Sequence, residues 1–119
     1  MPRIENRTRG NMLAERAEVA RGLFASMIGL LGRSALPAGE AMVFPRCRSI
    51  HTIGMRFPID VVFVDRSWKV VAFDTHVGPG RIIGPFWNAL AAVEIEAGSL
   101  KRSPVQITDQ LRLTTRDCS

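Results

Sequence analysis

The segment Ile59–Asp65, with the sequence IDVVFVD, constrains the fold more than any other part of the chain. Its β-branched and aromatic side chains are typical of a β-strand. Apolar side chains alternate between the two faces, with Ile59, Val61 and Phe63 on one and Val62 and Val64 on the other. A strand that is apolar on both faces must be covered on both sides. The sequence therefore predicts a layered β structure around this segment.

Further strands are predicted from short apolar runs that are bounded by turn residues. They are Ala41–Phe44, Lys69–Phe73, Ala91–Ile95 and Gln110–Leu113. Lys69–Phe73 follows Ile59–Asp65 after a short loop, which is the spacing of a hairpin, although this loop has no glycine. Asn11–Val19 fits either a strand or the run into a helix. Ala97–Arg102 can form one helical turn, which Pro104 ends.

One longer helix is predicted over Gly22–Gly32. Phe24, Met27, Ile28 and Leu31 recur at the i, i+3, i+4 and i+7 positions that share one helix face. Gly32 suits the C-terminal end, because glycine adopts the left-handed conformation without a Cβ clash. The chain of 119 residues, 1–119, is therefore expected to be a single domain, mostly β, with one main helix.

The formal net charge of +5 is unevenly distributed along the chain. Of the 16 basic residues, only Lys69 and Lys101 are lysines, and the rest are arginines. Arg46, Arg48 and Arg56 occur with no acidic residue between them. This local excess fits a specific anion site better than a nucleic-acid groove, which needs more extensive phosphate contacts. An arginine-rich composition can also have no function, with the side chains simply solvated.

No segment approaches the ~18–20 apolar residues of a transmembrane helix, and the first ten residues lack the apolar run of a secretory signal. Cys47 and Cys118 are far apart and are expected to be free thiols, as in a cytoplasmic chain. A disulfide could form only if the C-terminal residues fold back onto Cys47. We therefore expect a cytoplasmic protein without membrane attachment, and the sequence does not predict its oligomeric state.

The segment Cys47–Asp65, CRSIHTIGMRFPIDVVFVD, resembles a known family, as do three shorter motifs: GLLGR at Gly29–Arg33, PGRIIGP at Pro79–Pro85 and EIEAG at Glu94–Gly98. On these motifs the chain resembles the DUF192 family of small prokaryotic domains, over about residues 6–113. The resemblance implies a compact, mainly antiparallel β sandwich or barrel of the α+β class, with one main helix packed against it. It implies no known activity and no catalytic residue.

The chain departs from the family pattern in two turns. Family members usually have an Asp-Gly hairpin where this chain has Ser67 and Trp68, and a glycine-containing ending where it has Pro104 and Thr108. Both turns must therefore be built differently here. A sister branch of the family reads SFWMKNTLIPLD across the main motif and has tryptophan in place of His51, which suits a wall-lining role for His51 better than proton transfer.

Asp60 opens a strand that is predicted to be buried on both faces. A buried carboxylate is costly unless it is paired or accepts several hydrogen bonds. Its expected partners are Arg56 or backbone amides of the preceding turn. In one interpretation Asp60 holds that turn against the sheet, and in the other it orients His51 or an arginine that lines a pocket.

Cys47 as nucleophile, His51 as base and Asp60 as the orienting group would make a chemically coherent thiol enzyme. On an extended strand, however, Cys47 and His51 lie roughly 13 Å apart, so this arrangement requires a turn at Arg48 and Ser49. The sequence does not decide whether Cys47 is reactive, and it leaves the assignment as an enzyme open. Together with His76 and Cys118, these residues form no CxxC or HxxxH pair, so no metal or cofactor is predicted.

The candidate site lies beside the SIHTIGMRFPID turn and consists of Arg48, Ser49, His51, Thr52, Arg56, Asp60 and Arg81. Guanidinium groups donate paired hydrogen bonds to carboxylate or phosphate. Gly78, Gly80 and Gly84 would let a ligand approach the backbone, although any tight loop also needs glycine. Our leading hypothesis is a binding or accessory module with a pocket for a small anionic ligand or an acidic peptide. The alternatives are a thiol-dependent enzyme that uses Cys47 and a weak nucleic-acid binder.

Overall fold

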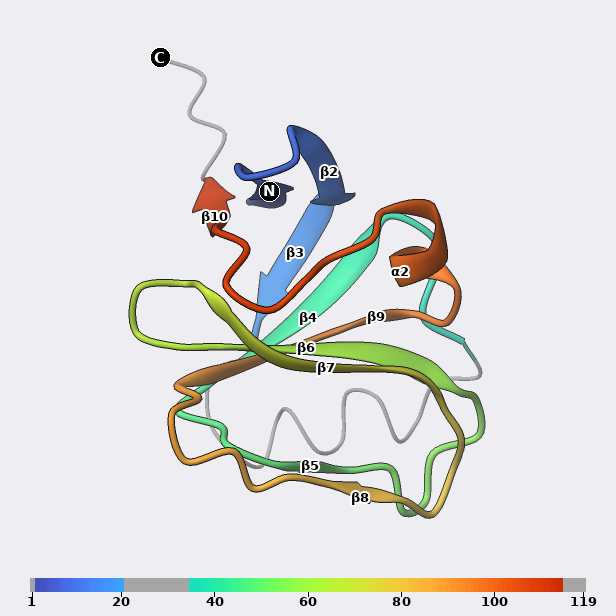
Figure 1. Cartoon of the computed structure of the whole chain (residues 1–119). Helices are drawn as coiled ribbons and strands as arrows, with labels where there is room; N and C mark the ends of the chain where they lie inside the picture. The colour runs from blue at the N-terminus through green and yellow to red at the C-terminus, as the bar shows by residue number, and fades with distance from the viewer. Residues whose placement is uncertain (1, 21–34, 115–119) are drawn as a thin grey trace.

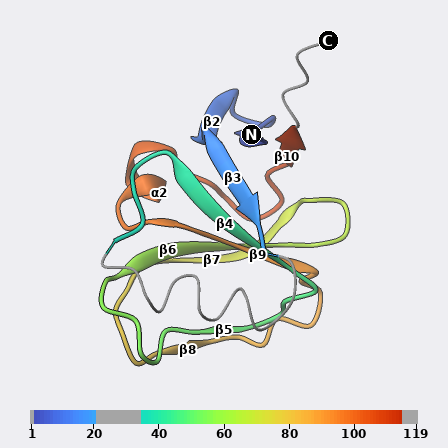
Figure 2. The ribbon, with the colours of Figure 1, turned by 180° about the vertical axis from the view of Figure 1, so that it is seen from behind.

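The computed structural model describes residues 2–20 and 35–114, so the helix predicted over Gly22–Gly32 and the residue Cys118 lie outside the described part. The described strands form three layers (Figure 1). A five-stranded sheet lies between a three-stranded sheet and a two-stranded pair, and the view from behind shows the same arrangement (Figure 2). The fold is therefore mostly β and sandwich-like, as predicted, and the described strands form no closed barrel.

The five-stranded sheet has the strand order β3-β4-β9-β6-β7. Its strands are β3 (Arg16–Val19), β4 (Glu40–Pro45), β9 (Ala91–Glu96), β6 (Ile59–Val64) and β7 (Val70–Val77). β3 runs parallel to β4, and every other neighbouring pair in this sheet is antiparallel. The mainly antiparallel arrangement is thus confirmed.

The two outer layers are antiparallel throughout. Their strands are β1 (Arg3–Asn6), β2 (Asn11–Ala14) and β10 (Leu111–Thr114) on one side, and β5 (Ile50–His51) and β8 (Ile82–Ile83) on the other. A four-residue helix, α2 (Ser99–Arg102), follows β9 and confirms the single helical turn predicted there.

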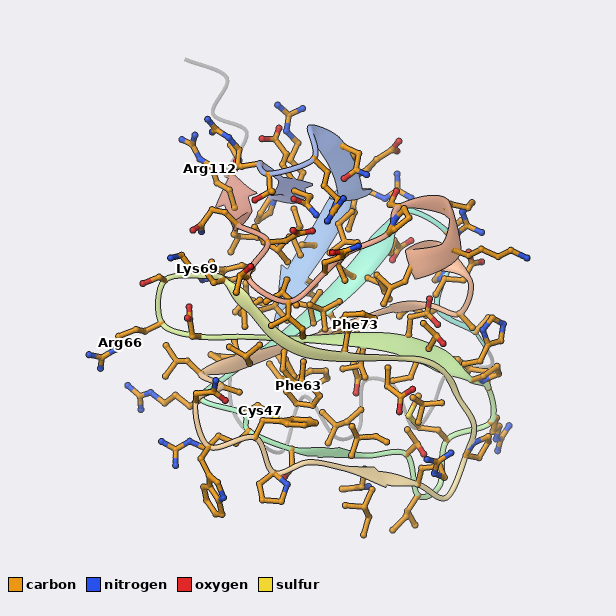
Figure 3. The ribbon with its side chains drawn as sticks, viewed as in Figure 1. Cys47, Phe63, Arg66, Lys69, Phe73 and Arg112 are labelled. Carbon is orange, nitrogen blue, oxygen red and sulfur yellow. The ribbon has the colours of Figure 1, made fainter. Side chains whose placement is uncertain are left out.

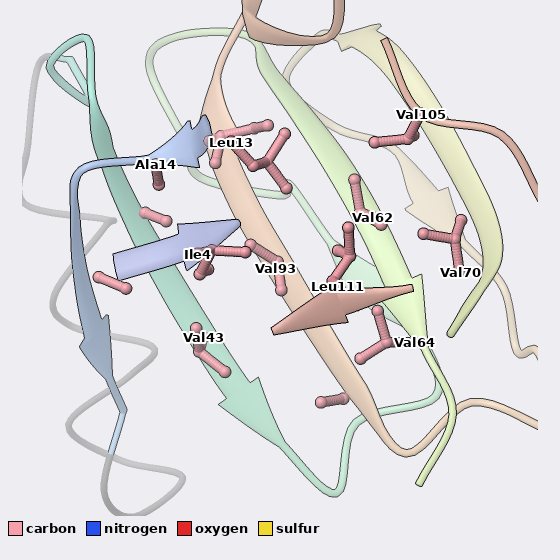
Figure 4. Close-up of a cluster of buried hydrophobic side chains, with 14 of the residues drawn as sticks. Ile4, Leu13, Ala14, Val43, Val62, Val64, Val70, Val93, Val105 and Leu111 are labelled. Carbon is pink, nitrogen blue, oxygen red and sulfur yellow. The ribbon is translucent and has the colours of Figure 1, made fainter. Parts of the chain in front are cut away.

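β6 explains why layers form on both sides of the central sheet, because all of its residues are buried. Val62 and Val64 pack in a cluster with Ile4 of the three-stranded sheet (Figure 4). The opposite face of β6 packs in a second cluster, which includes Ile50 and Ile83 of the two-stranded pair. Burial of one such side chain contributes about 1.5–3 kcal/mol, so both faces stabilise the layered arrangement.

The predicted strands are present, with ends that differ by a few residues. β7 is the longest and continues to Val77. The segment Asn11–Val19 forms strands, but it divides at Glu15 into β2 and β3, which belong to different sheets. β1 was not predicted because Ile4 is its only apolar residue, and a single apolar residue makes no strand pattern.

The β6–β7 hairpin contains no glycine, and the side chain of Asp65 stabilises its turn instead. Asp65 Oδ1 accepts hydrogen bonds from the backbone amides of Ser67 at 2.8 Å and Lys69 at 3.0 Å. Trp68 adopts the left-handed conformation, with φ of 64°, and its amide donates to the Asp65 carbonyl. Aspartate side chains commonly stabilise turns in this way, so the first departure from the family pattern has a local solution.

A second aspartate organises the turn before β10. Asp109 Oδ2 accepts hydrogen bonds from the Gln106 amide at 2.9 Å, from Asn6 at 3.0 Å and from the Arg9 guanidinium at 2.7 Å. Burial alone would raise the pKa of Asp109, but these hydrogen bonds lower it. Thr108, where the family pattern has a glycine-containing ending, adopts a φ of 77°.

Candidate functional site

Arg46–Pro58 and Gly78–Leu90 carry β5 and β8, and we call these two segments together the ribbon. They lie on the side of the five-stranded sheet opposite the three-stranded sheet (Figures 1 and 2). In the antiparallel register His51 pairs with Ile82, next to the buried pair Ile50–Ile83. Because successive side chains of a strand point to opposite faces, His51 and Ile82 share the exposed outer face of the ribbon.

Thr52 joins the two halves of the ribbon. Its backbone amide donates to the Arg81 carbonyl at 2.8 Å, and its hydroxyl accepts a hydrogen bond from the Arg81 amide at 2.8 Å. The same hydroxyl donates to the Gly78 carbonyl at 2.7 Å. The Thr52 carbonyl accepts from the amides of Met55 and Gly80. Thr52, which is fully buried, therefore has its hydrogen bonds used within the fold rather than open to a ligand.

Gly84 allows the two segments to approach closely at their other end. Its φ is 99°, and a Cβ at this position would lie 2.7 Å from the Arg48 carbonyl oxygen and 3.0 Å from the Ser49 Cβ. The Phe86 amide donates to that same Arg48 carbonyl at 2.9 Å. Gly84 was predicted to let a ligand approach the backbone, but the group that approaches it is the chain itself. Around Gly78 and Gly80 a Cβ would meet nothing within 4 Å.

The arginines of the ribbon are exposed and have no carboxylate partner among the described residues. They are Arg46, Arg48, Arg56 and Arg81, and both segments of the ribbon lack Asp and Glu entirely. In contrast, Arg9 and Arg102 pair with Asp109 and Glu96 at 2.7 Å. The Arg48 guanidinium lies over the ring of Trp87, 6.0 Å from its centroid, a distance at which a cation–π attraction acts.

Exposed apolar side chains accompany these arginines. Six large hydrophobic side chains are exposed in the described part of the chain, and four belong to the ribbon: Ile53 at 55%, Ile82 at 68%, Trp87 at 74% and Leu90 at 42%. The predicted candidates Arg48, Ser49, His51, Arg56 and Arg81 are likewise exposed in the ribbon. The structure thus places five of the seven candidates on one exposed element, together with apolar residues that were not predicted.

Asp60 lies apart from this group. It is fully buried, and Oδ1 accepts a hydrogen bond from the His76 amide at 2.8 Å. Oδ2 accepts from the amides of Gly98 at 3.1 Å and Leu100 at 2.9 Å. The prediction that backbone amides bond to Asp60 is therefore confirmed. The predicted amides of the preceding turn and the predicted partner Arg56 are wrong. The partners come from the end of β7 and the start of α2, so Asp60 joins these elements rather than orienting His51.

Cys47 does not form the arrangement of a thiol enzyme. Its thiol donates a hydrogen bond to the Ser49 carbonyl at 2.8 Å, and the side chain packs against the second hydrophobic cluster (Figure 3). Burial raises the pKa of the Cys47 thiol, and the nearby charge of Glu94 raises it further. A raised thiol pKa lowers the population of the nucleophilic thiolate. Asp60, the expected orienting group, is bonded elsewhere.

Glu94 is a buried titratable group that sequence reasoning missed. It is only 3% exposed, and its register partners on the neighbouring strands are the apolar Met42 and Val61. Both partners belong to the second cluster, so Glu94 faces the layer that the ribbon covers. Oε2 has no hydrogen-bond partner among residues 2–20 and 35–114, and burial raises the pKa of Glu94 to about 8. The sequence feature that could have indicated Glu94 is a single carboxylate residue within the otherwise apolar run AAVEI.

The described residues contain no group of three or more His, Cys, Asp or Glu side chains that could hold a metal ion. Within residues 2–20 and 35–114, no helix has the length and apolar character needed to cross a membrane. Two shallow cavities lie beside β2, one along Glu5–Met12 and the other between β2 and α2. Neither of these two cavities is lined by a residue of the predicted site.

Two solved structures share this fold. A protein from Sinorhizobium meliloti, described as a candidate transcription regulator, aligns with a TM-score of 0.78 and 20% identity over 94% of this chain and 91% of its own. A protein of unknown function from Novosphingobium aromaticivorans aligns with a TM-score of 0.74 and 23% identity over 93% and 82%. No curated protein matches the sequence. The model of the DUF192 family, described as uncharacterized ACR, matches residues 4–113. This chain therefore belongs to the DUF192 family.

Proposed function

We propose that this protein is a binding module whose ribbon recognises the anionic groups of a ligand or partner. The observation that carries the proposal is the composition of the ribbon, which has four exposed arginines, one exposed histidine and no acidic residue. Arginine donates paired, geometrically specific hydrogen bonds to carboxylate and phosphate oxygens. The absence of carboxylate partners within the described chain leaves these guanidinium groups available to an external anion.

Single contacts of this kind are weak. An exposed ion pair typically contributes about 0.2–1 kcal/mol, because water and salt screen it. Recognition by the ribbon therefore requires several arginines that act together, and Arg56 and Arg81 are suitable for testing this because both are exposed. Their replacement leaves the buried clusters intact. Cys47 does not favour a thiol enzyme, because burial raises the pKa of its thiol and the thiol donates its hydrogen bond to the Ser49 carbonyl.

The proposal is tested by thermal shift with citrate and pyrophosphate at constant ionic strength. Anion binding to the folded state raises the melting temperature, and the stabilisation grows with the logarithm of the anion concentration above Kd. We expect the stabilisation in the wild-type protein and its loss in the double variant Arg56→Gln/Arg81→Gln. The matched control is Arg66→Gln/Arg112→Gln, since Arg66 on the β6–β7 hairpin and Arg112 on β10 are also exposed but are not part of the ribbon (Figure 3). Equal stabilisation of both double variants would refute the proposal.

A further inference from the structure

We infer that the anionic partner of the ribbon is an extended acidic segment of another protein, whose apolar side chains pack between the arginines. This inference rests on the proposed function and adds the class of partner. Its starting point is the coincidence of two properties on one element. The ribbon holds four of the six exposed large hydrophobic side chains of the described chain, and it is also free of acidic residues.

Two of the exposed apolar side chains lie next to a histidine or an arginine. Ile82, which is 68% exposed, pairs in register with His51 and shares its face of the ribbon. Trp87, which is 74% exposed, lies beneath the Arg48 guanidinium. A partner that contacts Arg48 through a carboxylate therefore also meets the apolar ring of Trp87. A segment with acidic and apolar side chains in alternation complements both properties.

A small anionic ligand complements the ribbon less well. Sites for small molecules are concave and close a few polar groups around the ligand. In the ribbon the best candidates for such polar groups are already used, because the Thr52 hydroxyl bonds to Gly78 and Arg81 and Gly84 is filled by the Arg48 backbone. The ribbon retains the exposed arginines and the exposed apolar side chains. A small anion would leave those apolar side chains in water.

The residue types also favour a protein over a membrane or a nucleic acid. The centres of protein interfaces are enriched in tryptophan and arginine and depleted in lysine, aspartate and glutamate. The ribbon follows this composition, since both lysines of the chain, Lys69 and Lys101, lie outside it. Nucleic-acid binding depends mainly on phosphate contacts, and four arginines at separate positions supply fewer than the roughly 6–10 contacts of a strongly salt-dependent binder.

The inference is tested with three synthetic peptides of equal length by isothermal titration calorimetry. The first alternates glutamate with leucine or phenylalanine, the second replaces every glutamate by glutamine, and the third replaces every apolar residue by serine. We expect the first peptide to bind, and the other two to bind at least about tenfold more weakly, because each lacks one of the two complementary properties. Ile82→Ser should weaken binding of the first peptide but not of the third. Ile107→Ser, at a residue that is 52% exposed outside the ribbon, is the matched control and should change neither.

The outcomes separate this inference from the proposed function. If citrate stabilises the protein through Arg56 and Arg81 but the first peptide binds no more tightly than the third, the partner class is wrong while anion recognition stands. If vesicles of phosphatidylcholine and phosphatidylserine, or single-stranded DNA, bind through the same arginines more tightly than the first peptide, a protein partner is also refuted. If Arg56→Gln/Arg81→Gln alters binding of none of these probes, both proposals fail.

Discussion

Thr52 and Arg81 are joined by two reciprocal hydrogen bonds, since the Arg81 amide donates to the Thr52 hydroxyl and the Thr52 amide donates to the Arg81 carbonyl, each at 2.8 Å. The strands β5 and β8 contain only two residues each, so strand pairing alone provides few bonds between the segments of the ribbon. Thr52 supplies the additional bonds next to these strands. It thereby fixes the backbone from which the exposed Arg81 side chain extends.

Thr52→Val keeps the shape of the side chain and removes the hydroxyl. The Arg81 amide and the Gly78 carbonyl would both lose a partly buried hydrogen bond to Thr52. We expect the free energy of unfolding to fall by about 1–3 kcal/mol, because each of the two hydrogen bonds contributes about 0.5–1.5 kcal/mol. Urea unfolding measures this change, with Thr75→Val at an exposed position of β7 as the control. A Thr52→Val protein as stable as the wild type would show that these bonds contribute nothing.

Gly84→Ala tests the close approach between the two segments of the ribbon. The new Cβ would lie 2.7 Å from the Arg48 carbonyl oxygen, at a φ of 99° that disfavours any side chain. Gly10→Ala is the matched control, because Gly10 has a φ of 73° but nothing within 4 Å of an added Cβ. We expect Gly10→Ala to cost about 1–2 kcal/mol from backbone strain alone, and Gly84→Ala to cost clearly more. Equal losses in thermal denaturation would show that the backbone approach is not tight.

Asp60→Asn tests the connection between β7 and the start of α2. The substitution places an amide donor where the amides of His76, Gly98 and Leu100 require acceptors. We expect a loss of about 3 kcal/mol, since hydrogen bonds to a charged group are among the stronger ones. Asp74→Asn is the control, because within the described residues the Asp74 carboxylate accepts a hydrogen bond only from the adjacent Thr75 amide. Denaturant unfolding that ranks the two variants equally would contradict this account of Asp60.

The raised pKa of Glu94 predicts that the free energy of unfolding depends on pH. Its pKa is about 8 in the folded protein, against an ordinary value of 4.5. Between these values the folded chain binds one more proton than the unfolded chain, so the free energy of unfolding decreases as the pH rises, by at most about 1.4 kcal/mol per pH unit. The stabilisation that the extra proton on Glu94 provides is complete below pH 4.5 and is lost above about pH 8.

Glu94→Gln should remove this contribution to the slope, because glutamine does not titrate. Unfolding curves recorded between pH 5 and 8 measure the slope in each variant. Glu96→Gln is the control on the same strand, since Glu96 is partly exposed and pairs with Arg102. A Glu94→Gln protein with the same slope as the wild type would show that Glu94 is ionised in the folded state at neutral pH.

The layered fold was predictable from β6, because alternating apolar residues on two faces leave few alternatives to two covering layers. The strands at the edges were less predictable. β1 has one apolar residue, Ile4, and β8 lies within a segment whose glycines and prolines predicted only a loop. In both cases strand formation depends on pairing with a distant strand, β10 or β5, and such pairing leaves no local pattern.

The sequence predicted that the candidate arginines belong to neighbouring segments, but it did not predict their surroundings. The arginines without acidic neighbours lie in the ribbon. The partners of Asp60 were not predictable, because Gly98 and Leu100 lie 38 and 40 residues further along the chain. The exposure of Ile82 and Trp87 was also not predictable, because sequence reasoning assigns large apolar residues to the core.

The most direct test of the central claim, that the ribbon is the binding surface, is a titration followed by ¹H–¹⁵N nuclear magnetic resonance spectroscopy with the peptide that alternates glutamate and apolar residues. We predict that the chemical shifts that change most belong to the amides of Arg46–Pro58 and Gly78–Leu90, together with the indole N–H of Trp87. Amides of β1, β2 and β10, in the layer on the other side of the central sheet, should not move. Shifts that are concentrated in those three strands, with the ribbon unchanged, would contradict the claim.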